Sequence, residues 1–176
     1  MRTRAARVLR LVILLGTALG VGAVYALVPV GSTPALRPDL ILIEKSAHTL
    51  FLLRSDHVIR SYRVSLGRNP VGPKTRNGDH KTPEGLYRVD WRNPQSKFHL
   101  SLHISYPNAQ DVANARRDGT QPGGDIMIHG LPNHLWWIGR FHRWIDWTDG
   151  CIAVTNWEMD QLWRSVPDGS PVEIRP

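Results

Sequence analysis

The chain contains only one cysteine, Cys151, among its 176 residues. A single cysteine excludes an intramolecular disulfide and a zinc site built from several thiolates. A lone cysteine is most often a small buried hydrophobic residue. A catalytic role for Cys151 therefore has to be argued from the residues around it.

Acidic residues are fewer than basic ones, and the formal net charge is +7. Without four N-terminal arginines the net charge falls from +7 to +3; these are Arg2, Arg4, Arg7 and Arg10. The other basic residues are scattered and form no dense run that would follow a phosphate backbone. We therefore expect no nucleic acid among the partners, whereas a mildly basic surface suits an acidic cell-wall polymer.

The segment from Leu11 to Val30 has no charged residue and directly follows those arginines. A basic stretch followed by an apolar run of about 20 residues is typical of an export signal or a membrane anchor. We expect residues 1–30 to form a signal peptide or an uncleaved inner-membrane helix, with the anchor slightly favoured. The positive-inside rule then places the rest of the chain in the periplasm or elsewhere in the cell envelope.

Residues 31–38 are rich in Gly, Ser, Thr and Pro, which predicts a linker to a globular domain over 39–176. In this domain short apolar runs alternate with turn-forming residues. This pattern predicts a mainly β domain, a sandwich or barrel, with one or two short helices. Strands are expected at 40–44, 49–54, 57–66, 86–91, 100–106, 125–128, 151–154 and 171–174, helices at 108–117 and 155–165, and loops at 67–85 and 132–148.

Cys151 follows Gly150 at the junction between a turn and a short apolar strand. Glycine leaves room for a ligand beside the backbone, and consecutive amides in such a turn can stabilise an oxyanion. A thiol is weakly ionised at neutral pH and needs a nearby base to act as a nucleophile. His129 is the best candidate base, because it stands at the end of an apolar strand, where a reactive side chain has a rigid support.

Three motifs in order resemble the L,D-transpeptidase catalytic domain family (YkuD-type). They are Gly78 to Gly85, which is similar to the family's Gly-Asp-x-x-Thr-Pro-Glu-Gly loop, then Met127-Ile128-His129-Gly130, and then Thr148-Asp149-Gly150-Cys151. The resemblance covers roughly Leu40 to Ile174.

The resemblance implies a β fold of that type and action on peptidoglycan stem peptides outside the inner membrane. In such an enzyme Cys151 would be the nucleophile, His129 its base, and the carbonyl of Gly130 would orient the imidazole. Amides around Asp149, Gly150 and Cys151 would form the oxyanion hole, and Thr148 would belong to the same oxyanion or substrate site. A thioester would form, and an amine acceptor, from a neighbouring stem or a lipoprotein lysine, would resolve it. No metal or organic cofactor is implied.

Asp149 departs from the family pattern, which commonly has histidine before the Gly-Cys pair. A carboxylate beside a thiol raises the thiol pKa and so opposes activation. Asp149 would instead accept a hydrogen bond from a substrate ammonium group or a nearby arginine. Two alternatives stay open: a carboxypeptidase or amidase that uses the same residues with water as acceptor, and a non-catalytic peptidoglycan-binding module.

Other residues support weaker hypotheses. His134, His142 and Asp146 with His129 would make a metal site, but their spacing fits no usual zinc helix. Arg140 and Arg143 would bind carboxylates of the stem, although solvated surface arginines are the simpler interpretation. The tryptophans between Pro132 and Trp147 form either a lid over the site or a layer packed on the core.

Overall fold

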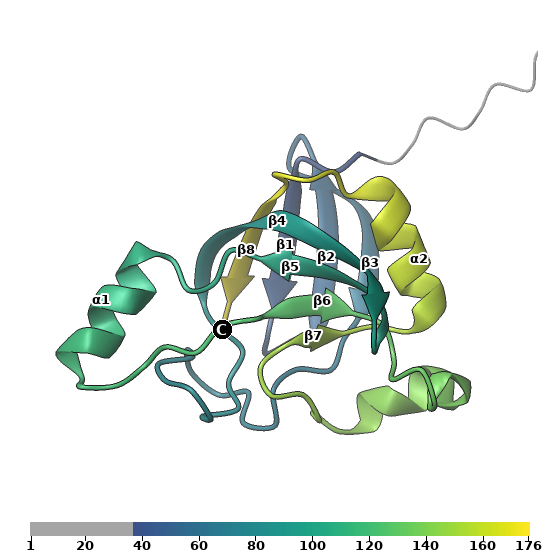
Figure 1. Cartoon of the computed structure of the whole chain (residues 1–176). Helices are drawn as coiled ribbons and strands as arrows, with labels where there is room; N and C mark the ends of the chain where they lie inside the picture. The colour runs from purple at the N-terminus through teal and green to yellow at the C-terminus, as the bar shows by residue number, and fades with distance from the viewer. Residues whose placement is uncertain (1–36) are drawn as a thin grey trace, which may run out of the picture. The chain divides into compact units, whose positions relative to one another are not determined.

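The computed structural model describes residues 37–176, which form eight strands, two α-helices and one 3-10 segment. The strands are β1 (Leu40–Glu44), β2 (Thr49–Arg54), β3 (His57–Arg63), β4 (Gly85–Ser96), β5 (His99–Ile104), β6 (Met127–His129), β7 (Ile152–Ala153) and β8 (Pro171–Arg175). The helices are α1 (Ala109–Arg117) and α2 (Asn156–Ser165), and the 3-10 segment η1 is Trp136–Trp144. As Figure 1 shows, α2 lies beside the strands and α1 stands apart on the other side.

The eight strands form one sheet in the order β3-β2-β1-β8-β4-β5-β6-β7. Strand β4 pairs with β8 over its first residues and with β5 over the rest, so it belongs to both halves of the sheet. The backbones of Ser65, after β3, and Ala153, in β7, exchange two hydrogen bonds of 3.0 and 2.9 Å. These bonds join the two ends of the strand order, so the sheet is closed in the manner of a barrel.

The interior is filled by aliphatic side chains from both halves of the sheet, which supply most of the driving force for folding. Members with no exposed surface include Ile41, Ile43, Leu50, Leu52, Leu102, Ile104, Ile128 and Ile152. Helix α2 adds Met159 and Leu162 to this core and packs against β5. Its start is fixed by a capping box in which Thr155 and Glu158 satisfy each other's backbone amides.

The mainly β prediction is confirmed, and most predicted elements are present. Strand β3 is shorter than expected and β4 longer, because β4 continues past residue 91 into a hairpin with β5. The expected loop at 132–148 contains η1, so there are three helical segments instead of one or two. Segment η1 consists of two 3-10 turns joined by Gly139, whose backbone is not helical.

The predicted N-terminal helix and most of the predicted linker lie outside the described residues. None of the helices within residues 37–176 is long and apolar enough to cross a bilayer.

Candidate active site

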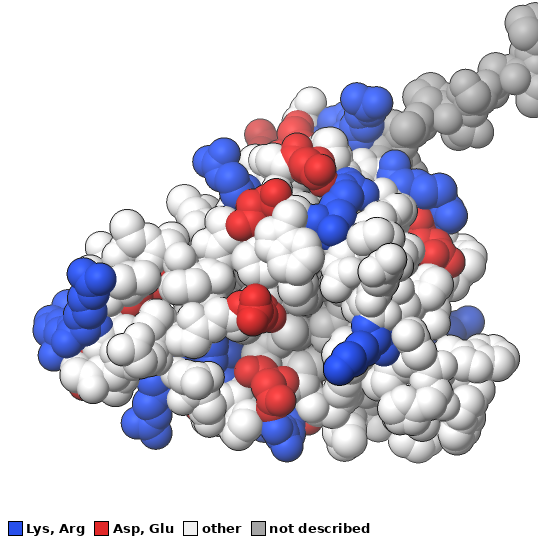
Figure 2. Space-filling view, in the orientation of Figure 1, with Lys and Arg blue, Asp and Glu red and all other residues white. Residues whose placement is uncertain are grey.

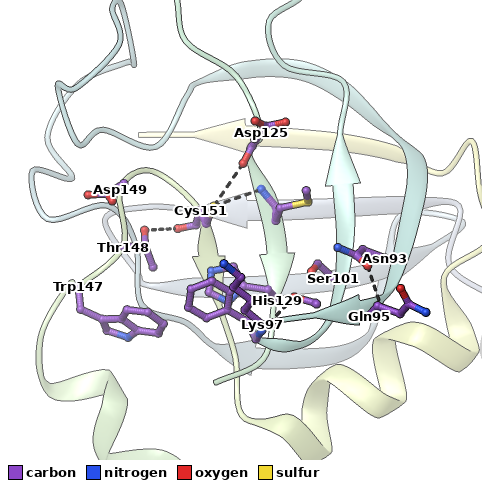
Figure 3. Close-up of a pocket in the computed structure, with 13 residues that line it drawn as sticks. Asn93, Gln95, Lys97, Ser101, Asp125, His129, Trp147, Thr148, Asp149 and Cys151 are labelled. Atoms are coloured by element: carbon purple, nitrogen blue, oxygen red, sulfur yellow. Dashed lines mark hydrogen bonds between the residues drawn. The ribbon is translucent and has the colours of Figure 1, made fainter. Parts of the chain in front are cut away.

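Cys151 and His129 line the same pocket, which has a volume of about 570 Å³. Figure 3 shows Cys151, His129 and Trp147 on one side of this pocket, with Asn93 and Gln95 of the β4–β5 hairpin across from them. The complete lining is Asn93, Gln95, Ser96, Lys97, Phe98, Ser101, Asp125, Met127, His129, Trp147, Thr148, Asp149 and Cys151.

His129 ends β6 and is almost completely buried, with 3% of its surface exposed. Its Nδ1 lies 2.6 Å from the carbonyl oxygen of Gly130. A carbonyl only accepts, so Nδ1 carries the proton and Nε2 is left with a free lone pair. Burial lowers the pKa of His129 to about 4, so the ring is neutral at pH 7. The imidazole is therefore held in the tautomer that a general base needs.

Two aromatic rings enclose the imidazole of His129. The ring of Phe98 lies 4.5 Å away between centroids, and the ring of Trp147 lies 5.7 Å away, edge to face. These rings keep water from the imidazole and fix its plane, which accounts for the burial that lowers its pKa.

Cys151 stands immediately before β7, which runs parallel to β6 with Ile128 opposite Ile152 and His129 opposite Ala153. Because side chains alternate along strands, Cys151 and His129 lie on the same face of the sheet. The Cys151 thiol lies 3.4 Å from the amide of Met127, which donates to it, and 3.6 Å from the carbonyl oxygen of Asp125, to which it donates. Among residues 37–176, the thiol therefore forms hydrogen bonds with the main chain of Met127 in β6 and of Asp125 before it, and none with His129.

The pKa of the Cys151 thiol is raised to about 11, mainly by burial. The Met127 amide lowers this pKa, while the carboxylates of Asp149 and Asp125 raise it further. With His129 neutral, the pocket at rest holds a protonated thiol and a free base. The geometry suits proton transfer during attack rather than a preformed thiolate–imidazolium pair.

The turn before Cys151 is organised by Thr148, whose side chain is buried. Its Oγ accepts from the Gly150 amide at 3.1 Å and donates to the Cys151 carbonyl at 2.7 Å. The Gly150 amide is thus engaged inside the turn. The amides of Asp149 and Cys151 donate to none of the residues that the structure describes, so they remain available to an oxyanion.

Position 150 requires glycine for two reasons, its backbone conformation and the close approach of the main chain of Lys81. Its φ is +133°, and a β-carbon there would lie 2.6 Å from the carbonyl oxygen of Lys81. The sequence predicts that this glycine leaves room for a ligand, but the space is taken by the chain itself.

The Asp149 side chain is 74% exposed and turns toward the loop at 67–85. It accepts hydrogen bonds from the guanidinium of Arg68 and, at 2.8 Å, from Nδ1 of His80. The hydrogen bond from Arg68 is the main reason that the pKa of Asp149 is lowered. The arginine partner foreseen for this carboxylate is therefore present, and it ties the nucleophile turn to the upstream motif.

Residues of the Gly78 to Gly85 motif hold the loop in shape. Asp79 accepts from Lys74 at 2.8 Å and from the amides of Thr75, Arg76 and Lys81, and its pKa is lowered to about 2. Thr82 accepts from the Gly67 amide at 3.0 Å. Glu84 pairs with the buried Lys45 at 2.7 Å.

The weaker candidates have other partners. His142 contacts Ser65 at 3.0 Å, and Asp146 pairs with His48 at 2.9 Å. Arg143, expected to be solvated, instead binds Glu158 at 2.5 Å, whereas Arg140 is exposed. Within residues 37–176 no group of three or more His, Cys, Asp or Glu is arranged to hold a metal ion.

Neither proposed role fits all the tryptophans between Pro132 and Trp147. Trp147 lines the pocket, but Trp136, Trp137 and Trp144 are 65–79% exposed and neither cover the core nor line the pocket. Sequence reasoning missed Phe98, Ser101 and the hairpin residues Asn93 to Lys97. A long β4–β5 hairpin was the signal that could have found them, since its tip reaches the pocket.

The fold and this site have known relatives. A family model described as the L,D-transpeptidase catalytic domain matches residues 38–174. The chain is 32% identical over 136 residues to "Putative L,D-transpeptidase YafK" of Escherichia coli (strain K12), covering 73% of this chain and 47% of that protein. The chain therefore spans about half the length of the curated relative it matches.

Solved structures of similar fold include members of the same family. The helical cell shape determining protein Pgp2 of Campylobacter jejuni has a TM-score of 0.59 and 25% identity over 77% of this chain and 46% of that one. An L,D-transpeptidase of Xylanimonas cellulosilytica has a TM-score of 0.51 and 17% identity over 81% and 62% of the two chains, which supports the fold alone.

Proposed function

The chain belongs to the L,D-transpeptidase catalytic domain family, and on that premise we propose that it is a cysteine-dependent acyltransferase that acts on peptidoglycan stem peptides. The observation that carries the proposal is the shared pocket in which the Cys151 thiol and the unprotonated Nε2 of His129 lie on one face of β6 and β7.

In the proposed reaction Nε2 of His129 takes the thiol proton as the sulfur attacks the carbonyl carbon between the diamino acid and the terminal D-alanine. The resulting oxyanion accepts hydrogen bonds from the amides of Asp149 and Cys151. The imidazolium then returns the proton to the leaving amine, D-alanine departs, and a thioester remains on Cys151. An acceptor amine attacks the thioester and restores the thiol.

The raised thiol pKa and the lowered imidazole pKa make this proton transfer unfavourable in the free protein. A bound substrate changes the balance, because the oxyanion develops where the two free amides point and stabilises the charged state of the pair. The proposal therefore predicts a nucleophile that is slow without substrate and fast with it.

Hydrolysis is the second candidate, and the position of Asp149 is the observation that favours it. Its carboxylate is held at the mouth of the pocket by Arg68 and His80, where it would order a water molecule as readily as an ammonium group. The same thioester resolved by water would make the protein a carboxypeptidase or amidase.

The test is to incubate the protein with a tetrapeptide stem and measure both the acylated protein by mass spectrometry and the released D-alanine. Formation of an adduct on Cys151, with D-alanine release that an added amine acceptor accelerates and captures, supports transfer. Release that is independent of the acceptor supports hydrolysis. An unmodified Cys151, or turnover retained in Cys151→Ala, would leave the peptidoglycan-binding module as the explanation.

We further propose that the domain works in the cell envelope, attached to the inner membrane through residues 1–30 or secreted after their removal. The arginines and the charge-free run from Leu11 to Val30 support this location. A role in cell shape, by likeness to Pgp2, belongs to the same proposal.

A further inference from the structure

A group of large apolar side chains on η1 and on the residue that follows it is exposed beside the candidate active site. Trp136, Trp137, Phe141, Trp144 and Ile145, here called the aromatic patch, are each 64–79% exposed. Figure 2 shows the surface at the position that η1 occupies in Figure 1 as largely free of charged side chains. Several exposed large apolar residues within ten positions indicate a surface that binds a membrane or another molecule.

The structure holds these side chains outward. Along this stretch Leu135 and Ile138 are half-buried and His142 is buried, so these residues, and not the exposed aromatic ones, make the main contact with the domain. Phe141 and Trp144 contact each other edge to face at 5.0 Å between ring centroids. The aromatic patch is therefore an ordered surface and not a layer of the core.

The charges around the aromatic patch are arranged in favour of an anionic partner. Asp146 and Glu158, the nearby carboxylates, are only 15% and 13% exposed and are paired with His48 and Arg143. Arg140 lies between the aromatic residues, is exposed, and makes no ion pair with any residue in the described part of the chain. The exposed charge at this surface is therefore positive.

We propose that the aromatic patch docks the domain on a lipid bilayer that carries anionic headgroups. Tryptophan is enriched at the boundary between lipid and water, because its ring is apolar and its N–H is polar. Phe141 and Ile145 have no polar group to offer a sugar or a peptide, but both suit the acyl region. Arg140 would pair with lipid phosphates.

Two further observations favour lipid over other apolar partners. An apolar hollow of about 380 Å³ lies beneath the patch, lined by Pro132, Leu135, Ile138, Phe141, Ile145 and Trp147 among others, and has the dimensions for part of an acyl chain. Trp147 also lines the catalytic pocket, so docking would hold that pocket close to the lipid surface.

The sequence also predicts that the domain lies close to a bilayer. If residues 1–30 form the predicted anchor, the eight linker residues 31–38 span at most roughly 26–29 Å. A tether of this length keeps the domain at a high effective concentration beside the membrane. A modest affinity of the aromatic patch would then be enough to orient the domain.

The experiment is fluorescence quenching of the full chain by vesicles of phosphatidylcholine and phosphatidylglycerol with brominated acyl chains. All tryptophans lie between Trp91 and Trp163, so the predicted anchor contributes no signal. We expect strong quenching of tryptophan fluorescence. Changing Trp136, Trp137 or Trp144 to alanine should remove the part of the quenching that comes from that tryptophan. Trp144→Ala should lower the ratio of docked to undocked protein about tenfold, as reported by the remaining tryptophans.

Trp91→Ala is the matched control, because Trp91 is 42% exposed but lies on β4, outside the aromatic patch. Its removal should leave the lipid-dependent quenching unchanged. Arg140→Ala should lower docking about fivefold with phosphatidylglycerol and not at all with phosphatidylcholine alone. Circular dichroism of each variant checks that the fold is retained.

Three outcomes would overturn the proposal. The first is quenching that does not depend on the patch tryptophans. The second is a dimer without lipid that Trp144→Ala dissociates, which would make the patch an interface between copies. The third is protection of these tryptophans by glycan fragments alone. Acylation of Cys151 by the tetrapeptide stem in the same samples keeps this test separate from the proposed function, since a thiol that is not acylated while the quenching is intact refutes only the latter.

Discussion

Cys151 and His129 lie two register positions apart on the same face of neighbouring parallel strands, because Ile152 pairs with Ile128 and Ala153 with His129. This offset brings the thiol beside the Met127 amide, while the bond from Nδ1 of His129 to the Gly130 carbonyl leaves Nε2 as the unprotonated nitrogen of the ring. The relationship depends on backbone pairing alone. It therefore exists before any substrate binds, and the chemistry of the free thiol can be tested directly.

The first prediction concerns the pH dependence of Cys151 alkylation. With a pKa of about 11, only ~0.01% of the thiol is ionised at pH 7, so the rate with iodoacetamide should rise about tenfold per pH unit up to pH 10. Mass spectrometry of the alkylated protein gives the rates, with Cys151→Ser as the blank. A plateau already at pH 8 would contradict the prediction and indicate a preformed ion pair.

The second prediction is that Asp149 and Arg68 act on the thiol in opposite directions. The Asp149 carboxylate raises the thiol pKa, so Asp149→Asn should accelerate alkylation about threefold at pH 8. Arg68→Ala leaves that carboxylate without its strongest partner and should slow the reaction. The same alkylation assay measures both. If the two variants moved the rate the same way, the electrostatic explanation would fail and a loop movement would be the better one.

Elements with local signals were predictable from sequence. The capping box at Thr155 and Glu158 located α2 to within one residue, and the apolar runs located β1 and β2. The histidine, the cysteine and the upstream loop were found as motifs, and the structure places all three around one pocket or its mouth.

Features that depend on distant pairing were not predictable. The β4–β5 hairpin brings Phe98 against His129, a contact set by register over more than thirty residues of chain. The exposure of Trp136, Trp137 and Trp144 was also not predicted, because hydrophobicity alone assigns tryptophan to a core or a lid. On the same stretch of chain Leu135 and Ile138 are half-buried and His142 is buried, so these residues, and not the three tryptophans, face the domain.

The third prediction concerns the close packing at Gly150. Gly150→Ala places a methyl group 2.6 Å from the Lys81 carbonyl oxygen at a φ of +133°, so it should lower the free energy of unfolding by about 2–4 kcal/mol. Urea denaturation measures the change. Gly124→Ala is the matched control, because a methyl group there meets nothing within 4 Å, and it should be nearly neutral. Equal effects in the two variants would refute the packing argument.

The fourth prediction is loss of stability in mild acid. Burial lowers the pKa values of both His129 and His142 from 6.5 to about 4. Between pH 6.5 and pH 4 the unfolded chain binds these protons and the folded chain does not, so acidification favours unfolding, by up to about 3 kcal/mol for each histidine. His142→Asn should therefore reduce the slope of unfolding free energy against pH by roughly half in that window, as measured by urea denaturation at several pH values. An unchanged slope would mean that these histidines do not control the acid transition.

The last prediction separates the two bonds that Thr148 makes in the nucleophile turn. Its Oγ accepts from the Gly150 amide and donates to the Cys151 carbonyl, and both partners lose their bond in Thr148→Val, which has nearly the same shape. Leaving these groups unsatisfied should cost about 2–3 kcal/mol of stability. It should also lower kcat for D-alanine release at least tenfold, with a smaller change in KM, because the amides of the turn no longer point at the oxyanion. Thr148→Ser keeps the hydroxyl and should restore most of kcat. If the valine variant kept full kcat while losing stability, Thr148 would support the fold but would not position the oxyanion site.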